Sequence, residues 1–153
     1  MPFRFALAPL LRLRQSLERQ QAMRLSEASL AVVRAQELVS QMDRVLAESL
    51  RSRDAALRAG QSAAELQFAL LARENMKAQR QKFEVEVQRL EVERQRMALD
   101  YRRAYQEREV LETLATRQHS VYQQEQLQRE QRDLDASHLL QMWRKSREPK
   151  HQG

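Results

Sequence analysis

The sequence predicts an all-α protein, a long antiparallel two-helix coiled-coil hairpin that forms a single domain. Only 2 Gly and 3 Pro interrupt 153 residues, and Leu, Ala, Glu, Gln and Arg, all good helix formers, dominate the composition. Apolar residues recur at seven-residue intervals, which is typical of a coiled coil. One helix-stop signal stands directly beside one helix-start signal, at residues 59–62. Because only 5% of the residues are aromatic, we expect a narrow apolar seam between two helices rather than a globular core.

The first helix is predicted over residues 9–58. Pro9 is compatible with a first helical turn, where its missing N–H costs no hydrogen bond. Apolar residues then alternate at intervals of three and four, the a/d pattern of a coiled-coil seam. The seam consists of Leu25, Ala28, Val32, Ala35, Val39, Met42 and Leu46.

Residues 59–62 are predicted to form the turn. Gly60 can adopt the left-handed conformation that ends a helix. Ser62 and Glu65 have the spacing of a capping box, which begins a new helix. A kink in one continuous helix is the alternative interpretation of this segment.

The second helix is predicted over residues 63–147, before Pro149 and a short basic tail. Arg94, Arg108 and Gln118 interrupt its seam, and such polar residues lower stability while fixing register and partner. If residues 63–72 instead form a separate short helix, the part of helix two that extends beyond helix one becomes shorter. The apolar seam positions are Val87, Leu90, Met97, Tyr101, Ala104, Leu111, Ala115 and Tyr122.

The net charge of +6 comes from the two termini. Residues 1–25 hold five Arg and one Glu, residues 141–153 hold four Lys or Arg and one Glu, and the rest holds one more acid than bases. A hairpin brings both termini towards one end, so we expect a basic docking end for an acidic or ring-shaped partner. Solvated, frayed helix ends are the alternative. The docking candidates are Arg12, Arg14, Arg144 and Arg147, with Trp143 as an apolar contact.

A second candidate surface follows the turn. Leu66, Phe68, Leu71 and Met76 gather apolar side chains where helix one has little length left to cover them. Exposed apolar residues at one end of a rod often mark an interface. These residues therefore either bind a partner or simply close the hairpin.

The composition argues against an enzyme. The chain has no Gly-rich phosphate loop and no nucleophile motif, so we predict no catalytic residues, no cofactor and no small-molecule substrate. It has no cysteine, and Asp133, Asp135 and His138 on one helix supply too few ligands for a metal. The sequence argues against nucleic-acid binding despite a pI near 10.3, because most Arg residues alternate with Glu and Gln.

No apolar run approaches the roughly 20 residues that span a bilayer. The first 17 residues contain Arg and no acid, as mitochondrial presequences do, but no cleavage-like break follows them.

Two stretches of the chain resemble the FliJ family, the coiled-coil components of the bacterial flagellar type III export apparatus. The first is the run Phe5-x-Leu7-x-x-Leu10-Leu11-x-Leu13-Arg14 followed by Glu18, Ala22, Leu25 and Ala28. The second comprises Ala104, Arg108, Leu111-Glu112, Leu114, Arg117, Tyr122 and Glu125, then Glu130-Gln131-Arg132-x-Leu134-Asp135. Arg132 and Ala136 depart mildly from the family, which often has Lys and Glu there.

The resemblance implies a central stalk for the hexameric export ATPase that also escorts export chaperones. The basic ends would then dock in the ATPase ring, and the apolar residues after the turn would contact the export gate, a membrane protein. It also implies a cytoplasmic protein peripherally associated with the inner membrane at the export apparatus. The equivalent stalk of a virulence type III system, and a basic structural coiled coil bound to nucleic acid or the nucleoid, are the alternatives.

Overall fold

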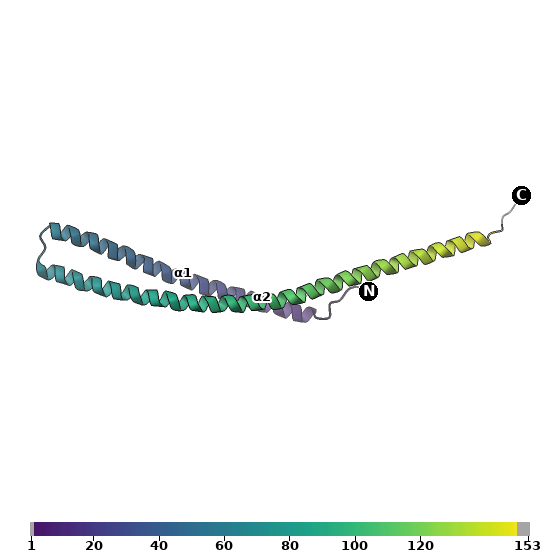
Figure 1. Ribbon diagram of the computed structural model, residues 1–153, viewed down its shortest axis with the longest axis horizontal. Helices are drawn as coiled ribbons and strands as arrows, with labels where there is room; N and C mark the ends of the chain where they lie inside the picture. The colour runs from purple at the N-terminus through teal and green to yellow at the C-terminus, as the bar shows by residue number, and fades with distance from the viewer. Residues whose placement is uncertain (1, 150–153) are drawn as a thin grey trace. The chain divides into compact units, whose positions relative to one another are not determined.

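The computed structural model describes residues 2–149 and contains two α-helices, α1 (Ala8–Arg58) and α2 (Ala63–Arg147) (Figure 1). All four helix ends lie within one residue of the ends expected from the sequence, and the described residues contain no strand. The predicted all-α hairpin of two long helices is therefore confirmed. α2 is continuous from its first residue, so residues 63–72 do not form a helix of their own.

The turn between the helices is a Schellman motif followed by a capping box. The Gln61 N–H donates to the Ala56 carbonyl (3.3 Å) and the Gly60 N–H to the Leu57 carbonyl (3.4 Å), which satisfies carbonyls at the end of α1. Gly60 has φ 79°, in the left-handed region that glycine adopts without steric cost. α1 therefore ends at this glycine rather than continuing through a kink.

The start of α2 is capped reciprocally. The Glu65 N–H donates to Ser62 Oγ and the Ser62 N–H donates to the Glu65 carboxylate, both at 3.3 Å. The two bonds satisfy donors that the first turn of a helix leaves without a partner.

The chain divides into two compact units, which we describe separately. The hairpin unit is Ser16–Tyr105, and the terminal unit is Met1–Gln15 together with Gln106–Gly153. In the hairpin unit α1 and α2 run antiparallel, side by side (Figure 1). Val32 and Ala35 of α1 and Ala104 of α2 are its buried apolar residues, and the other predicted seam positions of this unit are half-buried. Within the hairpin unit, each predicted apolar seam position is thus confirmed.

The seam also continues beyond the predicted positions, through both polar and apolar residues. In α1 the half-buried row runs on through Gln21 and Glu18 at one end and Ser49 and Arg53 at the other. In α2 it runs back towards the turn with the same spacing. Its additional members there are Leu66, Ala69, Arg73, Met76, Arg80 and Phe83.

In the terminal unit, the N-terminal segment contacts the part of α2 that follows Tyr105. The Phe3 ring lies 5.1 Å from the His119 ring and 5.5 Å from the Tyr122 ring, measured between centroids. Arg14 forms an ion pair with Glu107 (2.5 Å). Gln118, which we expected on the seam, is exposed. From Leu127 to Arg147 every residue of α2 is exposed.

Candidate partner-binding surfaces

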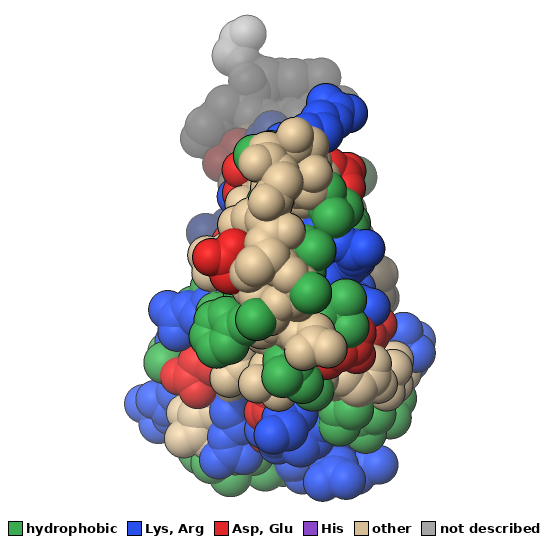
Figure 2. All heavy atoms as spheres, turned by 90° about the vertical axis from the view of Figure 1, so that its left-hand side faces the viewer, with side chains coloured by type: hydrophobic (Ala, Val, Ile, Leu, Met, Phe, Trp, Pro, Cys, Tyr) green, Lys and Arg blue, Asp and Glu red, His purple; other side chains and the backbone are tan. Residues whose placement is uncertain are grey.

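The apolar residues after the turn separate into two pairs. Leu66 and Met76 are half-buried on the seam, where they close the hairpin, whereas Phe68 and Leu71 are 76% and 66% exposed. Viewed from the side on which the turn lies, apolar side chains stand among basic and acidic ones (Figure 2). Phe68 also lines a groove of about 590 Å³ between the last turns of α1 and the first turns of α2. Phe68 and Leu71 are therefore the members of this set that a partner can reach.

The first pair of docking candidates lies near the start of α1. Arg12 is exposed, and Arg14 is half-buried because it pairs with Glu107 of α2. The charge of Arg14 is thus partly neutralised within the terminal unit. Arg12 is the member of this pair whose side chain is open to solvent.

The second group lies on the last turns of α2. Trp143, Arg144 and Arg147 are exposed, and the Arg147 guanidinium stands 4.0 Å above the Trp143 ring. Such a cation–π contact orients both side chains on one helix face. Trp143 follows Glu107, the partner of Arg14, by 36 residues, or about 54 Å of helix. The structure thus does not bring the two basic ends together into one cluster.

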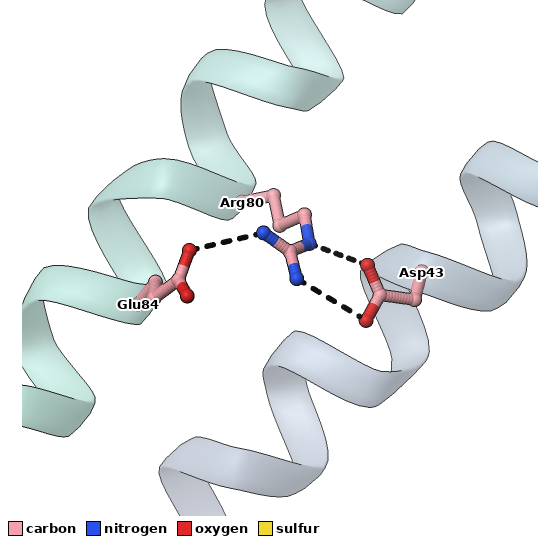
Figure 3. A network of polar contacts seen from close by, with 3 residues as sticks. All are labelled: Asp43, Arg80 and Glu84. Atoms are coloured by element: carbon pink, nitrogen blue, oxygen red, sulfur yellow. Dashed lines mark hydrogen bonds and ion pairs between the residues drawn. The ribbon is translucent and has the colours of Figure 1, made fainter.

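A cross-helix network sets the register of the hairpin unit. Arg80 of α2 reaches Asp43 of α1 through its Nε and, at 3.5 Å, through a second nitrogen, while its third nitrogen bonds Glu84 at 3.0 Å (Figure 3). The hydrogen bond and charge of Asp43 raise the pKa of Arg80. Because Asp43 and Arg80 are 37 residues apart, this contact is specific to one alignment of the two helices.

Further along α2, ion pairs one helical turn apart neutralise some of the arginines. Arg89 bonds Glu86 (2.6 Å) and Glu93 (3.5 Å), and Arg94 bonds Glu91 (2.5 Å). Hydrogen bonds from these arginines lower the pKa of Glu86 and of Glu91. Pairs at this spacing are typical of a solvated coiled-coil surface. The middle of α2 is consequently less basic in its surface chemistry than its arginine content indicates.

A comparison with protein families matches residues 3–148 to the flagellar FliJ protein family. The chain belongs to this family. It is therefore a component of the flagellar type III export apparatus. The family consists of export components rather than enzymes. The match agrees with the resemblance seen in residues 5–28 and 104–135. The chain matches no curated relative and no solved structure. Within residues 2–149, neither α1 nor α2 contains a stretch that is both long and apolar enough to cross a membrane.

Proposed function

We propose that this FliJ-family chain is the central stalk of the hexameric export ATPase, docking through its basic ends. The observation that carries the proposal is the last part of α2, where every residue from Leu127 to Arg147 is exposed. A helix of this length, about 30 Å, that no described segment covers is available to a partner. Its basic residues and Trp143 supply charge and an apolar contact, and guanidinium groups pair with carboxylates in two-point geometry.

The separation of the two basic ends lets their contributions be measured independently. Arg144→Glu/Arg147→Glu is expected to weaken ATPase binding and stimulation more than Arg12→Glu/Arg14→Glu, because Arg14 already pairs with Glu107. The charge swap Arg14→Glu/Glu107→Arg restores that ion pair and is the matched control for folding. Circular dichroism confirms helix content before binding is measured.

Binding of the wild-type chain should also weaken with salt, because the Debye length falls from about 10 Å at 0.1 M to about 3 Å at 1 M. Each exposed ion pair is weak by itself, so the effect is expected to grow with the number of arginines reversed. If the variant with Arg12, Arg14, Arg144 and Arg147 all changed to glutamate is folded and stimulates the ATPase normally, the docking surface lies elsewhere.

We further propose that Phe68 and Leu71 contact the export gate and that the protein escorts export chaperones in the cytoplasm beside the inner membrane. Exposed apolar side chains this large at a turn favour an interface over a purely structural role. Phe68→Ser/Leu71→Ser is expected to abolish gate binding at an unchanged melting temperature. Leu66→Ser/Met76→Ser, on the seam, is the contrasting pair and should lower the melting temperature. If the Phe68→Ser/Leu71→Ser variant still binds the gate as the wild type does, Phe68 and Leu71 do not form the gate contact.

A further inference from the structure

α2 carries a second apolar row on the face opposite its seam. Val85, Val92 and Leu99 follow one another at seven-residue intervals, and their side chains are 55%, 60% and 64% exposed. Val85 lies two residues after Phe83 and two before Val87, both half-buried on the seam. Two residues correspond to about 200° around a helix, which places this outer row on the side away from α1.

Helix formation by itself does not explain the outer row. β-branched residues such as Val85 and Val92 are poorer helix formers than the Glu, Gln, Lys and Arg that occupy most other exposed positions of α2. Exposed apolar side chains scattered singly need no explanation, but three that line up along one helix face form a stripe against which the apolar stripe of another helix can pack.

A row of cations runs along one edge of the outer row. This row also has seven-residue intervals and consists of Lys82, Arg89, Arg96 and Arg103. Each cation stands four residues after a residue of the outer row, or, for Lys82, after Ala78, which continues that row towards the turn. All four are exposed. Among the residues that the structure describes, only Arg89 of these four forms an ion pair, with Glu86 and Glu93. The other edge consists of Gln81, Gln88, Gln95 and, beside Leu99, Arg102, so it carries one cation at its far end and no acid.

These charges select among the helices that could cover the outer row. Two copies of α2 packed antiparallel through this row would place cation row against cation row, and like charges in such flanking positions are destabilising. Two parallel copies would place the cation row beside glutamines and Arg102 and gain no ion pair. A helix with an apolar stripe flanked by Asp or Glu satisfies both the apolar row and the cations.

We propose that the outer row, Val85, Val92 and Leu99 with its flanking Lys82, Arg89, Arg96 and Arg103, is a docking face for an acidic amphipathic helix of a partner protein. The face is separate from the basic ends and from Phe68, and it does not depend on the ATPase or gate contacts proposed above. Leu71 lies on the same seven-residue series, two intervals before Val85, and stays unchanged in the test.

The probe is a synthetic four-heptad helix with leucine at its a and d positions and glutamate at every flanking position. Its companion carries lysine in place of glutamate, and like charges keep each peptide from pairing with itself. Fluorescence anisotropy measures binding of each peptide to the full chain. We expect the acidic peptide to bind at least about tenfold more tightly than the basic one, with an affinity that falls as salt rises.

The test variant is Val85→Gln/Val92→Gln/Leu99→Gln, which keeps good helix formers and leaves the seam intact. It is expected to bind the acidic peptide at least about tenfold more weakly than the wild type, while Val110→Gln, an exposed valine outside the outer row, retains wild-type binding. Lys82→Gln/Arg96→Gln/Arg103→Gln should remove most of the salt dependence. Circular dichroism and an unchanged melting temperature show that the variants are folded.

Three results would overturn the proposal. The first is equal binding of the acidic and basic peptides, and the second is wild-type affinity in the triple valine–leucine variant. The third is a concentration-dependent dimer of the wild-type chain, seen by sedimentation, that the triple variant lacks, because the outer row would then join two copies of this chain.

Discussion

At the scale of single residues, adjacent side chains of one helix have opposite environments. Val32 is 4% exposed on the seam, whereas its neighbour Val33 is 48% exposed. The two residues share backbone, size and helix propensity, so any difference between their variants reports burial alone.

Val32→Asp is expected to destabilise the protein by a few kcal/mol, because it places a charge among apolar neighbours with no partner. Val33→Asp should change stability by no more than about 0.5 kcal/mol, as for other surface substitutions. Thermal melting followed by circular dichroism measures both. Equal melting temperatures for the two variants would mean that the seam has been placed on the wrong face.

Glu86 and Glu91 predict how stability depends on pH. Their pKa values are lowered by hydrogen bonds from Arg89 and Arg94 in the folded chain. A carboxylate with a lowered folded-state pKa stabilises the fold above its unfolded pKa and loses that contribution as pH falls through the folded value. The melting temperature should therefore fall on acidification below about pH 4.5.

The double variant Glu86→Gln/Glu91→Gln should show a shallower fall in melting temperature between about pH 6 and pH 3. Its matched control is Glu37→Gln/Glu48→Gln, which removes two exposed carboxylates from α1. If the melting temperature of the control falls as little on acidification as that of the test variant, the acid sensitivity arises from net charge and not from the Glu86–Arg89 and Glu91–Arg94 pairs.

At the scale of the elements, the turn depends on one backbone conformation. A Cβ at Gly60 would meet no atom within 4 Å, so any cost of substitution arises from φ 79° and not from a clash. Gly60→Ala is expected to cost about 1 kcal/mol. Gly60→Asn should cost less, because asparagine tolerates the left-handed region better.

Chemical denaturation of both variants measures this order. Ser62→Ala provides an independent comparison at the other side of the turn, and loss of its capping bond to Glu65 should also cost about 1 kcal/mol. A Gly60→Ala variant as stable as the wild type would indicate a turn that does not use the left-handed conformation.

The elements also show why some seam positions are polar. Arg80 occupies a seam position where an apolar side chain would be easier to bury, and it is held there by Asp43 and Glu84. Polar groups at such positions specify register at a cost in stability. In this chain the network joins α1 to α2 and so opposes sliding of one helix along the other.

At the scale of the whole molecule, the hairpin makes a distance prediction within the unit that contains the turn. Spin labels replacing Arg34 and Gln88, both exposed beside the seam, should lie within about two helix diameters, or roughly 20 Å. A single straight helix would separate residues 54 positions apart by about 80 Å. A distance distribution centred near the larger value, measured on dilute protein, is incompatible with the hairpin.

Residues close in sequence determined most of the fold. The seven-residue periodicity placed Val32, Ala35 and Ala104 on the seam, and Gly60 with Ser62 and Glu65 defined where one helix ends and the next begins. Helix periodicity, capping and left-handed glycine are all set by neighbours within one or two turns, which is why these features could be predicted. The resemblance of residues 5–28 and 104–135 to the FliJ family indicated a component of the flagellar export apparatus.

Contacts between distant residues were decided only by the tertiary structure. It paired Asp43 with Arg80 and Arg14 with Glu107, set Phe3 against His119, and left the last turns of α2 exposed. It also separated basic ends that a simple hairpin was expected to join. Each of these facts depends on which part of one helix lies opposite which part of the other, a register set by the length of the turn and by cross-helix contacts that no local pattern specifies.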